Sequence, residues 1–257
     1  MMTREWVGRC RVAVVDDGGG VDRAAAVARF VGCPVVGRGQ SGVDASLLVR
    51  LDRLELQLAG DARSRGVFVD FIAGRGRHRR PSARQPLARA VGVAAGRTVV
   101  DATAGFGADA FTLASLGCRV TAVERSPIVF ALLRDGLDRA ATVPALESII
   151  RERLKTVVAD GRAWLYGIAA EDRPDVVYLD PMYVPEPGAT ALVRKEMRWL
   201  RTLVGDDGDA VELFEVARRV ARERVVVKRM GHAPPLGGEP TVRYQGTVVR
   251  YDAYFGA

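Results

Sequence analysis

Apolar and polar positions alternate in two different ways along this chain, and the change falls near residue 87. In the first seventy or so residues, short runs with a period of two predict strands, and one stretch with helical spacing predicts a helix. The predicted strands cover residues 10–16, two pairing segments within 46–60, and 66–74, and the predicted helix covers 21–32. Their connections are mostly local, so residues 1–72 are expected to form a small α+β module.

From residue 87 onward, predicted strands and helices follow one another in turn. The strands are expected at 97–102, 118–124, 154–160, 174–180 and 224–229, the helices at 106–117, 126–140, 161–169, 191–205 and 209–223, and a hairpin with a Gln-Gly turn at 241–255. This alternation is typical of an α/β fold, in which a mostly parallel sheet has helices on both faces. Ligands bind such sheets beyond the carboxyl ends of the strands, where the strand order reverses.

A basic, turn-rich stretch separates the two blocks, AGRGRHRRPSARQP at residues 73–86. Its glycines, prolines and arginines are typical of a linker. We therefore expect three parts, which are a small module at 1–72, a basic linker at 73–86 and an α/β domain at 87–257.

Composition narrows the class of protein. A hydrophobic content of 48% and the absence of any uncharged apolar run of ~18 residues indicate a globular chain without a transmembrane helix. The N-terminus lacks the order of segments found in a signal peptide, and the three cysteines stand singly, so a reduced, cytoplasmic protein is expected. The two histidines have no cysteine pair nearby, and no metal site is expected.

The net charge is +7, and the sequence pI is about 9.8. Clustered basic side chains gain affinity for phosphates by releasing counterions, so this charge favours a polyanionic partner. An arginine-rich codon usage would produce the same charge, and the net charge alone does not decide between the two.

The first strand of the second block runs into the loop DATAGFGADAF, residues 101–111. Gly105 and Gly107 allow a sharp turn and a close approach of a ligand to the backbone. A glycine pair of this kind would also suit a dinucleotide, but Asp109 in the first turn of the following helix would repel a pyrophosphate. Asp101 and Asp109 favour a positively charged ligand, and we expect S-adenosyl-L-methionine, bound along Asp101, Ala102, Gly105 and Gly107.

Acidic residues also end the following strands. Glu124 lies nineteen residues past Gly105 and is placed to accept the hydroxyls of a ribose. Asp160 and Gly161 end a third strand and are placed to contact an adenine edge. The alternative for Asp160 is a helix N-cap, because an aspartate at this position commonly accepts a backbone N–H bond.

A fourth strand ends in the sequence Asp180-Pro181-Met182-Tyr183. Its carboxylate, together with the carbonyl of Pro181, could accept the two hydrogens of an amine and direct the nitrogen lone pair toward a methyl group. The ring of Tyr183 could stack on a base. Asp180, Pro181 and Tyr183 are therefore the expected catalytic residues, and the alternative is an Asp-Pro turn with the tyrosine as ordinary packing.

These motifs, with ALVRKEMR, RVVVKR and APPL, resemble the ribosomal RNA small-subunit methyltransferase J family. The likeness extends from about Val69 to Tyr254 and is weaker over residues 1–68. It implies a class I, Rossmann-like enzyme that uses S-adenosylmethionine to methylate N2 of a guanosine in 16S ribosomal RNA, either free or within the small ribosomal subunit. Carried over by motif, the family's cofactor contacts fall on Ala108, Asp109, Glu124, Arg125, Asp160, Gly161 and Asp180. The sequence departs from the family at two positions. The family often has a charged residue where Ala108 stands, and it usually has a phenylalanine where Tyr183 stands.

The RNA is expected to contact basic residues at three places: Arg79 and Arg80 in the linker, Lys195 and Arg198 on one predicted helix, and Lys228 and Arg229 at a strand end. Phosphate contacts of this kind position an RNA without reading its sequence.

Three other functions stay open at this level. The methyl acceptor could be adenine N6 or a protein amide, although enzymes for those groups more often contain NPPY than DPMY. The protein could be an NAD-dependent oxidoreductase, against which Asp109 argues, or a non-catalytic RNA-binding protein, against which the acids at successive strand ends argue.

Overall fold

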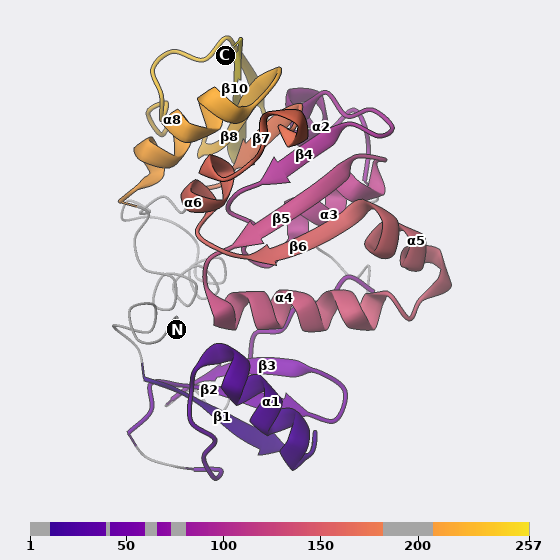
Figure 1. Ribbon diagram of the computed structural model, residues 1–257, viewed down its shortest axis with the longest axis vertical. Coiled ribbons are helices and arrows are strands. Elements are labelled where there is room, and N and C mark those ends of the chain that lie inside the picture. The colour runs from indigo at the N-terminus through magenta and orange to yellow at the C-terminus, as the bar shows by residue number, and fades with distance from the viewer. Residues whose placement is uncertain (1–10, 40–41, 60–65, 73–80, 182–207, 257) are drawn as a thin grey trace. The chain divides into compact units, whose positions relative to one another are not determined.

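The computed structural model describes residues 11–39, 42–59, 66–72, 81–181 and 208–256. They form two compact units, drawn in Figure 1. The first contains the described residues of Met1–Ala73 together with Ser126–Thr142, and the second contains those of Gly74–Arg125, Val143–Pro185 and Asp206–Ala257. The units are not continuous in sequence, and the domain limits at residues 72 and 87 stay a prediction.

A three-stranded sheet forms the centre of the first unit, in the order β1 (Val12–Asp17), β2 (Ala45–Arg50) and β3 (Leu54–Leu58). β2 is parallel to β1 and antiparallel to β3. Helix α1 (Val21–Val31) packs on β1, and α4 (Pro127–Ala140) packs on α1 and β3. The predicted strand at 66–74 is wrong over its described part, where only Val67 forms a bridge, with Leu56. The Asp70 carboxylate accepts the N–H of Ile72 at 2.9 Å, and such local bonds compete with a strand ladder.

The second unit contains a seven-stranded sheet whose order is β6-β5-β4-β7-β8-β10-β9. The bounds are β4 (Thr98–Asp101), β5 (Arg119–Glu124), β6 (Leu154–Val158), β7 (Val176–Leu179), β8 (Arg224–Met230), β9 (Val242–Gln245) and β10 (Val249–Phe255). Strands β4 to β8 are parallel to one another, and β10 is antiparallel to both of its neighbours, β8 and β9. The expected mostly parallel α/β sheet and its terminal hairpin are confirmed. The order reverses between β4 and β7, which is where such sheets bind ligands.

The helices of the second unit are α2 (Pro86–Val91), α3 (Ala108–Ser115), α5 (Pro144–Arg153), α6 (Gly161–Tyr166) and α8 (Ala210–Val220), with a short 3-10 turn, η1 (Ala170–Asp172). The sequence pattern anticipated α3, α6 and α8 but not α2, α5 or η1. The helix expected at 191–205 lies outside the described residues. None of the described helices is long and apolar enough to cross a membrane.

Strand alternation decides which side chains meet. Val100, Val177 and Val225 share one face of the sheet with Phe214 of α8, which lies in front of the strands in Figure 1. The residues that follow them along the strands, Asp101, Tyr178 and Val226, point to the opposite face, and Lys228 points there as well because successive side chains alternate. Helix α3, which contacts β5 and β6, brings Asp109 to this group.

Candidate active site at the carboxyl edge of the sheet

The glycine loop after β4 is held by a carboxylate from the next strand. Gly105 and Gly107 have φ values of +54° and +77°, a region that L side chains rarely adopt. The backbone N–H of Gly105 donates to Glu124 Oε2 at 2.8 Å, and Glu124 is only 5% exposed. Glu124 therefore positions the loop in addition to its predicted contact with a ribose.

The third strand end combines a cap with a close backbone approach. Asp160 Oδ1 accepts the N–H of Ala163 at 2.9 Å and so caps α6. A Cβ at Gly161 would lie 2.4 Å from the carbonyl oxygen of Ala102, closer than real contacts allow. Only glycine lets α6 begin this near to the loop after β4, and Gly161 consequently lies against Ala102. The predicted cofactor contacts of Ala102, Asp160 and Gly161 stay a prediction.

Asp180 lies directly beside that loop. Its backbone N–H donates to Thr103 Oγ1 at 2.6 Å, and the N–H of Thr103 donates to Asp101 Oδ1 at 3.1 Å. This connects the residue after β7 to the residue that ends β4, across the point where the strand order reverses. Thr103 was not among the predicted site residues. The sequence feature that could have pointed to it is its position two residues after Asp101, in the loop that follows β4.

Two carboxylates and one ammonium meet at this edge. Lys228 Nζ lies 2.8 Å from Asp109 Oδ2 and 2.8 Å from Asp180 Oδ2, and the hydroxyl of Tyr178 donates to Asp109 Oδ2 at 2.6 Å. Burial opposes the charge on Lys228, but Asp180 and Asp109 outweigh it and raise its pKa well above the usual range. Lys228 is therefore fully charged at neutral pH.

Asp101 lies beneath this cluster and is 1% exposed. Burial, and after it the carboxylate of Asp109, raise the pKa of Asp101 well above its usual range. The edge thus contains three carboxyl groups around one ammonium, and such an acceptor-rich set fits a cationic ligand group. S-adenosyl-L-methionine, which has a sulfonium and an ammonium group, matches that requirement.

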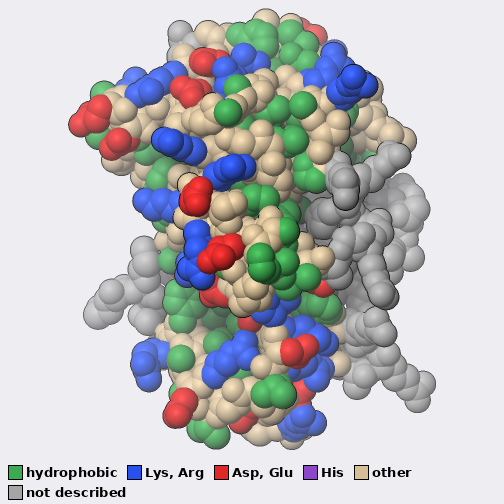
Figure 2. All heavy atoms as spheres, turned by 90° about the vertical axis from the view of Figure 1, so that its right-hand side faces the viewer, with side chains coloured by type: hydrophobic (Ala, Val, Ile, Leu, Met, Phe, Trp, Pro, Cys, Tyr) green, Lys and Arg blue, Asp and Glu red, His purple; other side chains and the backbone are tan. Residues whose placement is uncertain are grey.

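The predicted RNA-contacting residues differ in where their side chains lie. Lys228 is engaged with the two aspartates, and Arg229, 7% exposed, donates from Nε and from one terminal nitrogen to the carbonyl oxygen of Pro234 at 3.0 and 2.8 Å. Arg125, predicted at the cofactor, pairs with Asp209 at 3.3 Å. The remaining predicted contacts lie outside the described residues, namely Arg79, Arg80, Tyr183, Lys195 and Arg198. Among the described residues on the face drawn in Figure 2, basic and acidic side chains are interspersed.

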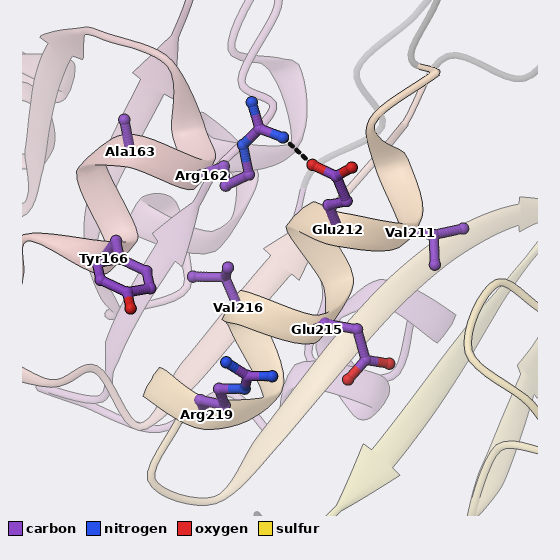
Figure 3. Close-up of a pocket in the computed structure, with 8 residues that line it drawn as sticks. All are labelled: Arg162, Ala163, Tyr166, Val211, Glu212, Glu215, Val216 and Arg219. Carbon is purple, nitrogen blue, oxygen red and sulfur yellow. Dashed lines mark hydrogen bonds and ion pairs between the residues drawn. The ribbon is translucent and has the colours of Figure 1, made fainter.

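A groove of about 650 Å³ lies elsewhere in this unit, between α6 and α8. Figure 3 shows Tyr166 and Val216 on its walls and the ion pair of Arg162 with Glu212 across its upper end. It shares no lining residue with the Asp109–Asp180–Lys228 cluster. A second hollow, of about 460 Å³, is lined by Thr98, Arg119 and Leu154, which begin β4, β5 and β6, so it lies at the opposite edge of the sheet from the acids.

Comparison with known proteins agrees with this geometry. The family model described as "Putative SAM-dependent methyltransferase" matches residues 39–256. Ribosomal RNA small subunit methyltransferase J of Thioalkalivibrio sulfidiphilus is 46% identical over 239 residues, which are 91% of this chain and 92% of that protein. The protein of the same name from Aeromonas salmonicida is 46% identical over 81% of this chain and 85% of its own length.

A crystal structure of a SAM-dependent methyltransferase from Neisseria gonorrhoeae is also similar. It has a TM-score of 0.74 and 34% identity, and the match covers 96% of this chain and 97% of that one. The loop, the acids at the strand ends and these similarities agree, and the chain belongs to the S-adenosylmethionine-dependent methyltransferases of the ribosomal RNA small subunit methyltransferase J family.

Proposed function

We propose that this protein methylates the exocyclic N2 of a guanosine in 16S ribosomal RNA. The observation that supports this most is the placement of Asp180, whose backbone bonds to Thr103 and whose carboxylate pairs with Lys228. It sits where the strand order reverses, in a family whose named relatives act on small-subunit ribosomal RNA.

Asp180 would accept a hydrogen bond from the substrate amine and direct the nitrogen lone pair outward. Bound S-adenosylmethionine supplies an electrophilic methyl group on its sulfonium. Asp180 would take up the proton that the nitrogen loses when it receives the methyl group, and the electrons of the former C–S bond would stay on sulfur. The Pro181 carbonyl would be the second acceptor for the amine. Tyr183 would stack on the guanine and so contribute roughly 1–3 kcal/mol toward splaying the base out of its stack.

The cofactor contacts are proposed on the same edge. Glu124 would accept the ribose hydroxyls, and Asp160 with Gly161 would contact the adenine. The remaining proposed cofactor contacts belong to the loop and its surroundings, namely Asp101, Ala102, Gly105, Gly107, Ala108, Asp109 and Arg125. They share their position, because each ends a parallel strand, lies in the loop that follows it or begins the next helix.

The decisive experiment is transfer of a labelled methyl group to small subunits and to free 16S RNA that lack the modification. Wild type, Asp180→Ala and Asp138→Ala would be compared, with the modified base identified by mass spectrometry. Asp138 is an exposed carboxylate on α4, and its removal controls for the loss of one charge. We expect N2-methylguanine from wild type and Asp138→Ala, and a rate reduced by about 10²-fold or more in Asp180→Ala.

The product decides between the remaining acceptors. N6-methyladenine, or label only in protein, would replace the guanine assignment. If wild type transferred no methyl group to any RNA while still binding S-adenosylmethionine, a role in RNA methylation would be wrong.

A further inference from the structure

The side chain of Lys228 is directed toward two aspartates, which is not the orientation expected of a lysine that binds a phosphate. It lies at the same level of the sheet as Asp180, since Leu179 of β7 pairs with Val227 of β8. Its side chain is 23% exposed, and its ammonium nitrogen lies 2.8 Å from a carboxylate oxygen of each of Asp109 and Asp180. A lysine that contacts RNA at the surface would direct its ammonium to solvent instead.

The residue type fits that position. The chain has 38 basic residues, of which only Lys155, Lys195 and Lys228 are lysines. An ammonium is a compact charge with three donors, whereas a guanidinium is a broad planar fork. The small group can lie between two carboxylate oxygens that belong to different elements, α3 and the end of β7.

The titratable side chains that surround the pairs of Lys228 come from four elements. Asp101 lies at the end of β4, Asp109 on α3, Tyr178 on β7 and Tyr251 on β10. Tyr251 is the residue of β10 that pairs directly with Lys228 of β8. Burial comes first and Asp109 second in raising the pKa of Asp101, of Tyr178 and of Tyr251, so these three groups are favoured in their neutral forms. The ion-paired groups that remain are Asp109, Asp180 and Lys228.

Those three groups together have a net charge of −1. S-adenosylmethionine has a sulfonium, an ammonium and a carboxylate, and therefore a net charge of +1. Without Lys228 the two aspartates would face each other as like charges, and one of them would take up a proton at a higher pH.

We propose that Lys228 is a positioning residue that holds the carboxylates of Asp109 and Asp180 together in their charged forms, and so sets the pH range in which the site binds its cationic cofactor and orients the substrate amine. This inference rests on the proposed function of the same site. It replaces the expectation that Lys228 contacts RNA phosphate, because one lysine joins Asp109, at the start of α3, to Asp180, directly after β7.

The test measures S-adenosylmethionine binding by calorimetry, and kcat/KM for RNA, from about pH 5 to about pH 9. The variants are Lys228→Met, Lys228→Arg and, as the matched control, Lys155→Met, since Lys155 is an exposed lysine on β6 of the same unit. At low pH both cofactor affinity and kcat/KM should fall, and this part of each profile is its acid limb. In Lys228→Met, we expect the acid limbs to move to higher pH by about one pH unit or more, because the two aspartates have lost the cation that they share. Lys228→Arg should restore the position of that limb with a lower kcat, and Lys155→Met should match wild type.

A second variant keeps the test valid if Lys228→Met does not fold. In Asp109→Asn, the ammonium is left with Asp180 alone, and the acid limb of kcat/KM should move to lower pH. Thermal unfolding of each variant establishes that folded proteins are compared. Unmoved acid limbs in the folded variants would overturn the proposal.

A phosphate contact would give a different result. Lys228→Met would then weaken RNA binding and lower its salt dependence by about one unit of slope, with cofactor binding and both pH limbs unchanged. That outcome also overturns the proposal. If wild type binds S-adenosylmethionine but modifies no RNA, the proposed function fails, and the pH dependence of cofactor binding still decides the role of Lys228.

Discussion

Asp160 serves as the N-cap of α6 through the 2.9 Å bond from the N–H of Ala163, and it is also proposed to contact the cofactor. A cap is worth about 1 kcal/mol, and asparagine caps as well as aspartate does. Asp160→Ala should therefore lower the free energy of unfolding by about 1 kcal/mol, whereas Asp160→Asn should not. Chemical denaturation of both variants measures the difference.

Cofactor binding separates the two roles of that carboxylate. If Asp160 contacts the adenine through its charge, both variants should bind S-adenosylmethionine more weakly than wild type in calorimetry. An Asp160→Asn variant with unchanged affinity would leave the residue as a cap alone.

Lys228 and Arg229 show how neighbouring residues take different roles. Both are basic and lie near the carboxyl end of β8, and the sequence analysis predicted that both contact the RNA. Alternation directs them to opposite faces of the sheet, where Lys228 finds two aspartates and Arg229 finds the carbonyl of Pro234. The chemistry of each position comes from the groups that helix α3, the end of β7 and the segment after β8 bring to it, which the residue type alone does not predict.

At the scale of elements, Gly136 in α4 allows the helix to approach the segment after β3. A Cβ at Gly136 would lie 2.6 Å from Cγ1 of Val69 and 3.0 Å from its carbonyl oxygen. Gly136→Ala gains about 1 kcal/mol of helix propensity but forces an overpacked contact that typically costs about 1–3 kcal/mol. We expect a net loss in the free energy of unfolding, measured by denaturant titration.

The double variant identifies the cause. Val69→Ala removes the methyl groups that the new Cβ would meet, so Gly136→Ala should be less destabilising in that background than in wild type. A Gly136→Ala protein more stable than wild type would mean that the helix moves away at little cost.

At the scale of the whole molecule, the net charge of +7 is the basis for the expected RNA affinity. Arg79→Ala with Arg80→Ala should weaken binding to every RNA tested, and should reduce the slope of log affinity against log salt by about one to two. Filter binding over a salt series measures both quantities. The control is Arg134→Ala, an exposed arginine on α4, combined with Arg151→Ala on α5.

An unchanged slope in the linker variant would place the RNA contacts elsewhere. A slope that fell equally in the control would show that affinity depends on net charge alone, and no local contact at residues 79 and 80 would then be needed.

The sequence by itself determined the strands of the second unit, its helices α3, α6 and α8, the glycine loop and the acids at the strand ends. These follow from local properties, namely hydrophobic periodicity and the backbone freedom of glycine. The strand expected at 66–74, wrong over its described residues 66–72, has a local cause as well, since the Asp70 side chain accepts the backbone N–H of Ile72.

Only the tertiary structure decided what each functional side chain touches. Lys228 meets Asp109 across 119 residues of chain, and Glu124 meets the N–H of Gly105 from the neighbouring strand. Both contacts depend on strand order and register, which the packing of the sheet determines and a linear pattern does not contain. The acids could therefore be found in the sequence, whereas the ammonium that joins two of them could be found only in the fold.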